Sequence, residues 1–535
     1  MKLFKLTSFH RRSIACFLFV VALFSISIYR LFSIGLDEKY LNTATLQGTY
    51  SLKIYDRRGT IFDCNLEKLT DQDFDVYSVV SPSPDGIETL KANLNGEDLE
   101  KYLTVLTKGN PVLINKELKN IYGGMTSVSV PKRYNNIATH LLGYTNSEGL
   151  GVSGIEGGMN DYLKNGGTVK VVFEKMANGT VVAGTKAQLI IENDHSQDVI
   201  LTIDKRIQKI VESAMGETSV GAVVVMEANT GKIKAMVSNP TFDPYNLSVS
   251  LESENSPFIN RTLYSYNAGS VFKPFVAAAA LENKITDYFC NCTGGTTIDN
   301  RYFKCHKTDG HGEMNLKTAL EESCNCYFYG ISEQIGAESL TSFLSNFRIE
   351  SKINLGGGII TNSGKITNKN DLSISKSALA NLSIGQGNLL ISPVQMAEMY
   401  SSIVNDGLMH SASVVEGTVD TDGNTVYTEI PSPTKVMKKQ TAEILKEYLI
   451  STVENGTGSV AKVDGAIIGG KTGTAQTGIL DSENETSLNG WFCGFIEKPN
   501  TIYTIVVMCE NAVSGSKDSG PIFKEIAESL YYLQD

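Results

Sequence analysis

Three short motifs, far apart in the chain, carry side chains that suit nucleophilic catalysis. Ser270 and Lys273 stand three positions apart in "SVFK", Ser323 and Asn325 flank a cysteine in "SCN", and residues 471–474 read "KTGT". A serine hydroxyl becomes an effective nucleophile when a nearby base accepts its proton, and a neutral lysine amine can be that base. The motifs therefore indicate covalent catalysis through a serine, provided that the fold brings them together.

The backbone around Ser270 distinguishes this serine from other copies of the same spacing. Pro274 fits a helix only in its first turn, where a missing N–H costs nothing, so a helix in "SVFKPFVAAAALE" must begin near Ser270. Lys273 then lies one turn along on the same face, and it must be neutral, which requires burial near other cations. We interpret the other Ser-x-x-Lys copies as surface residues: Ser129, Ser373, Ser432, Ser459 and Ser514.

The apolar patterns after residue 198 predict the scaffold that positions the motifs. Two apolar runs in "GAVVVMEANTGKIKAMVSNP" flank a hairpin signal, and three strand patterns follow late in "GAIIGGKTGTAQTG", "NGWFCGFIEK" and "TIYTIVVMCENA". Helical patterns fill the span between these groups and also end the chain. The simplest packing is an α+β domain with one five-stranded antiparallel sheet covered by helices.

The 535-residue chain is too long for one core, and its N-terminus predicts a membrane anchor. Basic residues precede an uncharged apolar stretch that begins at residue 13, and they favour a cytoplasmic N-terminus. The length of the apolar stretch favours an uncleaved membrane span over a cleaved signal peptide. The net charge of -11 argues against broad nucleic-acid binding. We expect a cytoplasmic tail at 1–12, a transmembrane anchor at 13–34, an extended strand-rich pedestal at 35–197 and the catalytic domain at 198–535, the last two outside the cytoplasm.

The nine cysteines leave three interpretations open. The stretch "CNCTGGTTIDNRYFKCHKTDGHG" resembles a zinc site, but Cys290 and Cys292 are two positions apart rather than three. An extracellular location favours a disulfide from Cys305 to Cys290 or Cys292. Free thiols and a bound metal ion are the alternatives. We expect no metal and no cofactor in the catalytic site, and we expect His140 to be packed or at the surface rather than catalytic.

Ser-x-x-Lys, Ser-x-Asn and Lys-Thr-Gly in this order occur in serine β-lactamases and penicillin-binding proteins. The chain resembles the class B penicillin-binding proteins, the membrane-anchored peptidoglycan D,D-transpeptidases. The likeness covers most of the chain beyond residue 50 and includes "RRGTIFDCN", "GVSGIEGGMNDYL", "DVILTIDKRIQ" and "LSIGQGNLLISPVQMA". It departs from the family pattern at four positions, of which the last lies inside the second motif: Ala268, Cys64, Leu66 and Cys324.

The resemblance implies a role for each residue of the three motifs. Ser270 would attack the penultimate D-Ala carbonyl of a stem peptide, Lys273 would accept its proton, and Ser323 would relay protons. The substrate would be held by Asn325, Lys471, Thr472, Gly473 and Thr474. The acyl group would then pass to an amine of a neighbouring stem. β-Lactams would acylate Ser270, and a SEDS-type membrane glycosyltransferase would be the partner.

Two rival functions follow from the same residues. A β-lactamase would share the nucleophile but needs a further base to activate water, and the sequence shows no clear candidate for it. A β-lactam sensor would need several membrane spans, of which only one is visible, and a non-catalytic cell-wall scaffold would tolerate loss of Ser270. We therefore expect a penicillin-binding, serine β-lactamase-like transpeptidase domain that follows a pedestal and one transmembrane helix.

Overall fold

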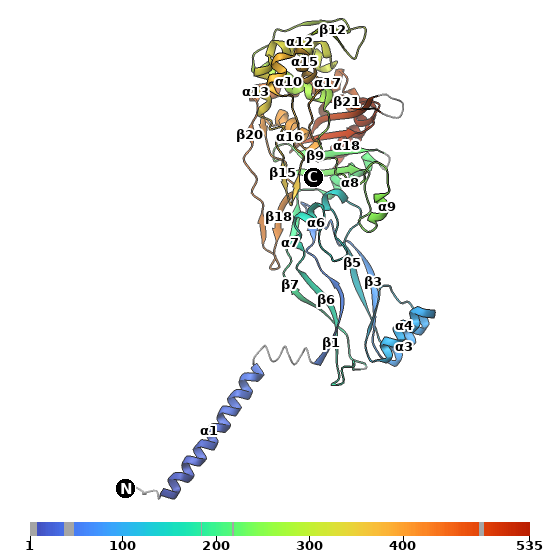
Figure 1. The fold of residues 1–535 in the computed structure, drawn as a ribbon, viewed down its shortest axis with the longest axis vertical. Helices are drawn as coiled ribbons and strands as arrows, with labels where there is room; N and C mark the ends of the chain where they lie inside the picture. Colours follow the sequence, from blue (N-terminus) through green and yellow to red (C-terminus); the bar gives the residue numbers. More distant parts are fainter. Residues whose placement is uncertain (1–7, 37–47, 183, 217–218, 481–485, 535) are drawn as a thin grey trace. The chain divides into compact units, whose positions relative to one another are not determined.

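The computed structural model describes residues 8–36, 48–182, 184–216, 219–480 and 486–534. By their contacts these residues form two compact units (Figure 1). Unit 1 comprises residues 1–57, 74–131 and 167–194, and unit 2 comprises 58–73, 132–166 and 195–535. Two segments that we assigned to the pedestal, 58–73 and 132–166, thus cluster with the catalytic region. The domain boundaries themselves stay a prediction.

The N-terminal helix has the properties of a membrane span. Helix α1 (Ser8–Leu36) is apolar. Its stretch Phe9–Leu36 has a mean hydropathy of 2.2, and its side chains are not buried against the rest of the protein. About 20 apolar residues suffice to cross a bilayer, so the helix is long enough to anchor the chain. A signal sequence can have the same length and apolar composition. Residues 1–7, with part of the predicted cytoplasmic tail, lie outside the described residues.

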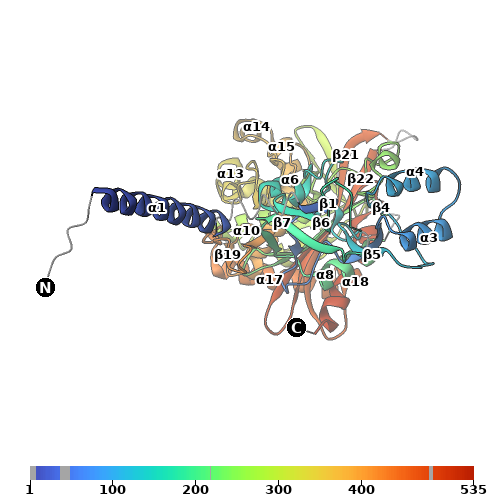
Figure 2. The ribbon, with the colours of Figure 1, turned by 90° about the horizontal axis from the view of Figure 1, so that it is seen from below.

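Unit 1 is built from two small sheets and a pair of helices. One sheet has the order β1 (Thr49–Asp56), β6 (Gly166–Glu174), β7 (Gln188–Asp194), and the other has the order β4 (Val112–Ile114), β3 (Asp73–Val80), β5 (Met125–Lys132). Helices α3 (Pro84–Asn93) and α4 (Gly96–Thr107) lie beside β4 and β5 in Figure 2. Ser83 caps α3 by accepting a hydrogen bond from the Gly86 N–H, and Leu90 and Leu106 pack against Ile114 in the core of this unit.

The centre of unit 2 is the predicted five-stranded antiparallel sheet. Its strand order is β10 (Ile233–Asn239), β9 (Gly221–Glu227), β23 (Ile502–Cys509), β22 (Thr486–Glu497), β21 (Ile467–Leu480). The sheet joins an early hairpin to three late strands through the pairing of β9 with β23. Strand β21, which carries the Lys-Thr-Gly motif, lies at the edge, so one side of its backbone is free to pair with another chain.

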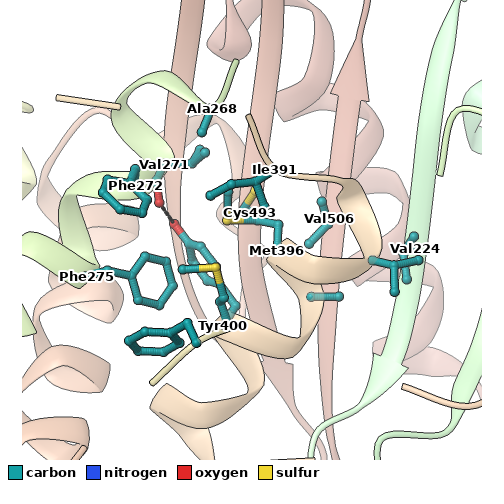
Figure 3. Packing of buried hydrophobic residues seen from close by; sticks show 14 of the residues in the cluster. Val224, Ala268, Val271, Phe272, Phe275, Ile391, Met396, Tyr400, Cys493 and Val506 are labelled. Carbon is teal, nitrogen blue, oxygen red and sulfur yellow. Dashed lines mark hydrogen bonds between the residues drawn. The ribbon is translucent and has the colours of Figure 1, made fainter. Parts of the chain in front are cut away.

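Helices cover both faces of this sheet because its strands are apolar on both sides. Val224 and Val506 belong to one hydrophobic cluster, while their neighbours Val223 and Val507 belong to another, as the alternation of side chains along a strand requires. Figure 3 shows the first face, where Met396 and other helical side chains pack towards Val224 and Val506. That face is covered by α10 (Lys273–Glu282), α12 (Asn325–Ile335), α16 (Pro393–Val404) and α17 (Lys439–Asn455), and the second by α8 (Lys205–Met215) and α18 (Gly520–Tyr532).

Smaller elements complete unit 2. A four-stranded sheet has the order β19 (Thr425–Tyr427), β18 (Val415–Val419), β8 (Asp198–Leu201), β2 (Ile61–Phe62). Four two-stranded sheets pair β11 (Cys290–Cys292) with β14 (Gly312–Met314), β12 (Gly295–Ile298) with β13 (Arg301–Lys304), β15 (Asn354–Gly356) with β16 (Ile359–Ile360), and β17 (Leu408–Met409) with β20 (Thr434–Lys435). Further short helices are α5 (Thr139–Leu142), α6 (Gly154–Gly158), α7 (Asn160–Leu163), α9 (Leu247–Leu251), α11 (Leu316–Glu321), α13 (Ala337–Ser345), α14 (Lys369–Ile374), α15 (Lys376–Ser383) and η2 (Ser459–Ala461).

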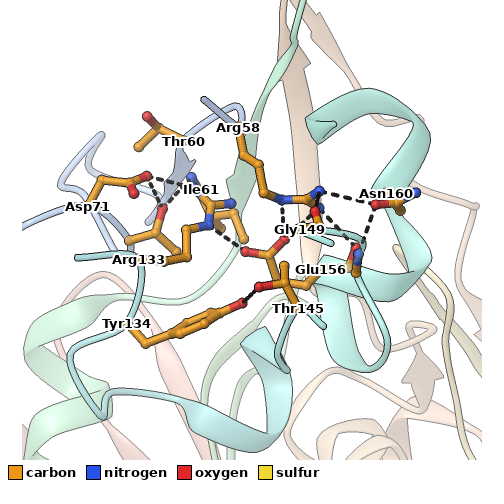
Figure 4. A network of polar contacts seen from close by, with 12 residues as sticks. Arg58, Thr60, Ile61, Asp71, Arg133, Tyr134, Thr145, Gly149, Glu156 and Asn160 are labelled. Carbon is orange, nitrogen blue, oxygen red and sulfur yellow. Dashed lines mark hydrogen bonds and ion pairs between the residues drawn. The ribbon is translucent and has the colours of Figure 1, made fainter. Parts of the chain in front are cut away.

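A buried ionic network ties separate segments of unit 2 together (Figure 4). Glu156, which is 0% exposed, forms ion pairs with Arg58 at 2.7 Å and with Arg133 at 2.5 Å. Arg133 also pairs with Asp71 at 2.6 Å. Each charge is therefore hydrogen-bonded, which is the condition under which a buried ion can be tolerated. Removing Glu156 leaves Arg58 without its ion-pair partner and leaves Arg133 with Asp71 alone.

Replacing Glu156 with alanine should accordingly destabilise the protein by about 3–5 kcal/mol, the usual cost of breaking a buried ion pair from one side. Thermal unfolding of the detergent-solubilised chain measures this change. Glu148→Ala is the matched control because Glu148 is an exposed glutamate in the same segment of unit 2. Equal melting temperatures for the two variants would contradict a structural role for the network.

Candidate active site

Ser270 lies on a tight turn that leads directly into a helix. The residues form a 3-10 turn, η1 (Gly269–Phe272), and α10 begins at Lys273 with Pro274 in its first turn. The predicted helix start is thus confirmed, although the serine occupies a 3-10 turn rather than the α-helix itself. The Tyr400 hydroxyl donates to the Val271 carbonyl at 2.8 Å, which fixes the turn from the side of α16 (Figure 3).

Glycine at 269 allows this turn to approach the edge strand. Its φ is 63°, a left-handed conformation that glycine adopts easily, and its N–H donates to the Gly385 carbonyl at 2.8 Å. A Cβ at this position would lie 2.8 Å from the Thr474 carbonyl oxygen. The close approach places the Ser270 turn directly beside the Lys-Thr-Gly strand.

Lys273 is fully buried and connects the first motif to the second. Its Nζ donates to the Ser323 carbonyl at 2.7 Å, to the Ser323 hydroxyl at 3.2 Å and to Asn325 Oδ1 at 2.7 Å. Burial lowers the pKa of the Lys273 amine to about 7. A substantial fraction of this amine is therefore neutral at physiological pH, as its predicted role as a proton acceptor requires.

The SCN motif occupies the turn between α11 and α12. Ser323 has a φ of 54°, which turns the chain sharply, and the Cys324 N–H donates to the Ala319 carbonyl at 2.9 Å. Asn325 is the first residue of α12, and its Nδ2 donates to the Lys304 carbonyl at 3.3 Å. The local fold thus directs Ser323 and Asn325 to the same place, while the cysteine between them is buried.

The third motif lies on edge strand β21, opposite the first. The amine of Lys471 is buried and donates to the Thr457 hydroxyl at 3.3 Å and to the Thr472 carbonyl at 3.2 Å. Burial, reinforced by the nearby charge of Lys273, holds the pKa of Lys471 well below its usual range. Burial thus lowers the pKa of both amines in the site.

Two further contacts explain the shape of the strand at this point. A Cβ on Gly473 would lie 2.9 Å from Val271 Cγ1, so only glycine fits beside η1 without movement. The Thr474 hydroxyl accepts a hydrogen bond from the Gly515 N–H at 3.2 Å, at the start of the π-helical turn η3 (Gly515–Ser519). The sequence analysis did not indicate Gly515 as a neighbour of the site.

One cleft of ≈ 410 Å³ collects these groups. Six of the eight predicted site residues line it, namely Ser270, Ser323, Asn325, Thr472, Gly473 and Thr474. The remaining two, Lys273 and Lys471, are buried and hydrogen-bonded to lining residues or their neighbours. The sequence did not predict His306, Thr457 or Ser516 as lining residues, because each belongs to a loop or turn with no motif of its own.

His140 lies outside this cleft. Its ring packs edge-on against Phe242, with 5.1 Å between ring centroids, and its Nε2 lies 2.6 Å from the Pro257 carbonyl oxygen. Burial lowers its pKa to about 4, so the imidazole is neutral and forms part of the packing. A cavity of ≈ 600 Å³ beside it is lined by Gln208 and Glu212 and contains no serine–lysine pair.

All nine cysteines are free thiols in the structure, so the disulfide that was one of the three sequence interpretations is not formed. Cys16 is exposed on α1, and Cys493 and Cys509 are buried in the sheet. In the 290–326 region, the sulfurs of Cys292, Cys305 and Cys324 and a ring nitrogen of His311 lie within 4.8 Å of one another.

The fold and the cleft together define a serine acyl-transferase of the type that uses Ser-x-x-Lys, Ser-x-Asn and Lys-Thr-Gly motifs. Residues 221–528 match the family described as "Penicillin binding protein transpeptidase domain". Because this match covers more than half of the chain, the chain belongs to the penicillin-binding protein transpeptidase family, which confirms the resemblance and the fold class.

Curated relatives and solved structures agree with this assignment. Stage V sporulation protein D of Bacillus subtilis is 27% identical over 482 residues, covering 82% of this chain and 72% of the relative. Peptidoglycan D,D-transpeptidase MrdA of Haemophilus influenzae is 27% identical over 425 residues, covering 73% of this chain and 64% of the relative. Penicillin binding protein 3 of Mycobacterium tuberculosis, solved with ampicillin, shares the fold with a TM-score of 0.66 at 22% identity, covering 90% of this chain and 95% of that one.

Proposed function

We propose that this protein is a membrane-anchored peptidoglycan D,D-transpeptidase that cross-links stem peptides through an acyl-enzyme on Ser270. The observation that carries the proposal is the convergence of three distant motifs on one cleft, with a buried lysine of lowered pKa beside the serine turn. The name of one relative supports the same activity, since MrdA of Haemophilus influenzae is described as a peptidoglycan D,D-transpeptidase.

In the first half-reaction, the Ser270 hydroxyl attacks the carbonyl carbon of the penultimate D-Ala, and its proton passes to the neutral amine of Lys273. Collapse of the tetrahedral intermediate breaks the peptide bond and releases the terminal D-Ala, whose amine nitrogen takes a proton through Ser323. The hydrogen bond from Lys273 to the Ser323 hydroxyl supports this role, since it joins the base to the group that hands the proton on.

In the second half-reaction, an amine of a neighbouring stem peptide attacks the ester carbonyl. Ser323 and Lys273 take its proton, and Ser270 regains its hydroxyl proton as the ester bond breaks. The products are a new amide bond and the free enzyme, so no further reactant is consumed. A β-lactam resembles the D-Ala-D-Ala end, and its acylation of Ser270 leaves an ester that no amine displaces rapidly.

The edge strand supplies substrate binding and charge stabilisation. A substrate peptide pairs with β21 as an added strand, and Gly473 keeps this edge free of side chain. The backbone N–H groups of Ser270 and Thr474 form the oxyanion hole, where each donor contributes about 3–4 kcal/mol to the transition state. The hydroxyls of Thr472 and Thr474 bind the terminal carboxylate, the buried Lys471 adds positive potential behind them, and Asn325 holds the substrate amide.

The proposal predicts transfer rather than hydrolysis. The detergent-solubilised chain, given a donor peptide that ends in D-Ala-D-Ala and an excess of a D-amino acid acceptor, should release D-Ala and attach the acceptor to the penultimate residue. Mass spectrometry of the products measures both outcomes. Hydrolysis without acceptor product, together with rapid release of a penicilloyl group, would instead support the β-lactamase rival.

The orientation of the chain in the membrane and the identity of its membrane partner also belong to the proposal. Arg11 and Arg12 at the start of α1 favour a cytoplasmic N-terminus and place the catalytic unit outside the cytoplasm. The apolar side chains of α1 are unburied, and they suit contact with a SEDS-type membrane glycosyltransferase, a partner that rests on the class B resemblance. Co-purification that survives replacement of α1 and of unit 1 by unrelated segments would contradict this partner surface.

A further inference from the structure

A cavity of ≈ 600 Å³ lies at the edge of the five-stranded sheet that is opposite the catalytic cleft. One of its walls is β10, the outer strand at that edge, whereas β21 with the Lys-Thr-Gly motif is the outer strand at the other. The remaining walls are the second half of α8 and the loop that leads into α5. Cavities of this volume commonly hold small ligands. The lining residues all belong to the described part of unit 2, and none comes from a catalytic motif.

One carboxylate in this cavity is held in a fixed orientation by three segments of the chain. Glu212 Oε1 accepts hydrogen bonds from the Ala138 N–H at 2.7 Å and from Gln208 Nε2 at 2.9 Å. Gln208 is 0% exposed, and its amide also bonds the N–H and the carbonyl of Met236, at 2.9 Å and 3.1 Å. Ala138 has a left-handed φ of 49°, a conformation that costs an alanine energy and that persists only where its surroundings hold it. Both bonds to the carboxylate use Oε1, so Oε2 can accept from a ligand.

The lining carries one negative charge and no positive charge that balances it. Among the described residues that line the cavity, Glu212 is the only acidic one, and none is a lysine or an arginine. Burial lowers the pKa of His140 to about 4, so this lining residue is neutral. Lys209 attracts Glu212 from an exposed position on α8, outside the lining. Glu212 also lies in the last turn of α8, where the helix dipole disfavours a negative charge. A cation in the cavity would therefore stabilise the ionised carboxylate.

The rest of the lining suits a hydrocarbon chain with polar groups at its margins. The apolar side chains of the lining are those of Ala138, Met236, Val237 and Pro240. Hydroxyl groups come from Thr139, Ser213, Ser238 and Thr241. A ligand with an apolar body and one charged end would match this distribution, because its body removes apolar surface from water while its charge lies on the carboxylate.

We propose that this cavity binds an alkylammonium ligand, with its protonated amine on Glu212 and its hydrocarbon chain along Met236 and Val237. Other classes of ligand fit less well. An anion would meet a carboxylate and no cation, and a neutral apolar molecule would bury that carboxylate without a partner. A divalent metal ion would find a single carboxylate, where such ions usually have several charged or carbonyl oxygens. Binding of the amine does not depend on the proposed function.

Two sources could supply such a group, namely a free diamine and the side chain of a lysine-type residue in a peptide. Cadaverine, a linear diamine, represents the first source, and Nα-acetyl-lysine amide represents the second. Isothermal titration calorimetry with the detergent-solubilised full chain measures the affinity for each. Tighter binding of one of them identifies the source.

Probes of the same chain length test whether the charge decides binding. Pentanediol carries hydroxyl groups in place of the amines of cadaverine, and glutarate carries carboxylates. Pentanediol should bind the wild type about 10- to 100-fold more weakly than cadaverine, because it cannot form a charge-assisted hydrogen bond to Glu212. Glutarate should not bind in this cavity, since its charge has the same sign as that of Glu212.

A charge-neutral variant assigns the binding to this cavity. Glu212→Gln keeps a carbonyl oxygen that can accept from the Ala138 N–H, and it should bind cadaverine as weakly as the wild type binds pentanediol. Glu528→Gln is the matched control, because Glu528 is an exposed glutamate on α18 outside the cavity. Both variants change the net charge of -11 by the same amount, so non-specific attraction of a diamine to the chain is equal in the two. The control should bind cadaverine as the wild type does.

The proposal is overturned if the wild type binds neither amine, or if it binds cadaverine and pentanediol equally well. These results come from the wild type, so a variant that fails to fold does not affect them. Equal affinity of Glu212→Gln and Glu528→Gln for cadaverine would also overturn it, since the amine would then bind elsewhere, for example in the catalytic cleft. Penicillin labelling of Ser270 in the wild type tests the proposed function separately, so the failure of one proposal can be told from the failure of the other.

Discussion

Replacing Ser270 with alanine should abolish covalent labelling by penicillin and transfer of the stem peptide. The reaction depends on an ester to the serine oxygen, and alanine has no atom that can form it. Loss of the nucleophile in a serine enzyme lowers turnover about 10⁶-fold, so the remaining activity should fall below detection. Gel labelling with a fluorescent penicillin, together with the donor–acceptor assay, measures both effects.

Ser459→Ala is the matched control for this variant. Ser459 begins another Ser-x-x-Lys sequence with Lys462, but it is exposed and lies on η2 rather than on the turn beside β21. This control should label and turn over as the wild type does. Labelling that persists in Ser270→Ala, or is lost in Ser459→Ala, would mean that the nucleophile has been assigned to the wrong serine.

Replacing Lys273 with methionine should slow acylation by about 10²- to 10⁴-fold, the usual contribution of a general base. Methionine has a similar length and no charge, so it fits the buried position while it removes the proton acceptor. The hydrogen bonds to Ser323 and Asn325 are lost at the same time. Stopped-flow acylation by penicillin measures the rate, and an unchanged melting temperature separates loss of the base from loss of the fold.

The same lysine should set the pH dependence of the wild type. Burial lowers the pKa of Lys273 to about 7, and only the neutral amine accepts a proton. Acylation should therefore fall as the pH decreases below about 7, approaching tenfold per unit, and level off above it. Lys273→Met should lack this transition. A variant that keeps both the rate and the midpoint would show that another group is the base.

Much of the fold was predictable because local patterns agreed with the final packing. Pro274 fixed the start of α10 near Ser270, and the apolar runs of β9, β10 and β23 indicated sheet strands. The strand order was not predictable in the same way, since the pairing of β9 with β23 joins segments almost 280 residues apart. That pairing depends on tertiary packing, which no local pattern encodes.

The predicted site residues converge because each motif belongs to an element whose position the core determines. The sequence predicts that Lys471 helps to hold the substrate, and the structure buries it behind the cleft, where it is hydrogen-bonded to Thr457. His306, Ser516 and Gly515 were not predicted, because they reach the cleft or its strand from turns that have no recurring spacing. Their positions near the cleft depend on how distant parts of the chain pack, which a local sequence pattern does not encode.

The sequence spacing of the cysteines does not predict which of them lie together in the structure. In the sequence, Cys290 and Cys292 form a close pair, and their two-residue spacing argues against zinc. The structure instead groups Cys292, at the end of strand β11, with Cys305, His311 and Cys324, which lie in three loops or turns further along the chain. A cluster assembled in this way has no short signature, so only the three-dimensional arrangement reveals it.

The most direct test of the central claim is intact mass spectrometry of the full chain after reaction with penicillin, followed by peptide mapping of the adduct. Convergence of the three motifs on one reactive serine predicts a single long-lived penicilloyl group, located on the peptide that contains Ser270. No stable adduct, or an adduct on any other residue, would contradict it.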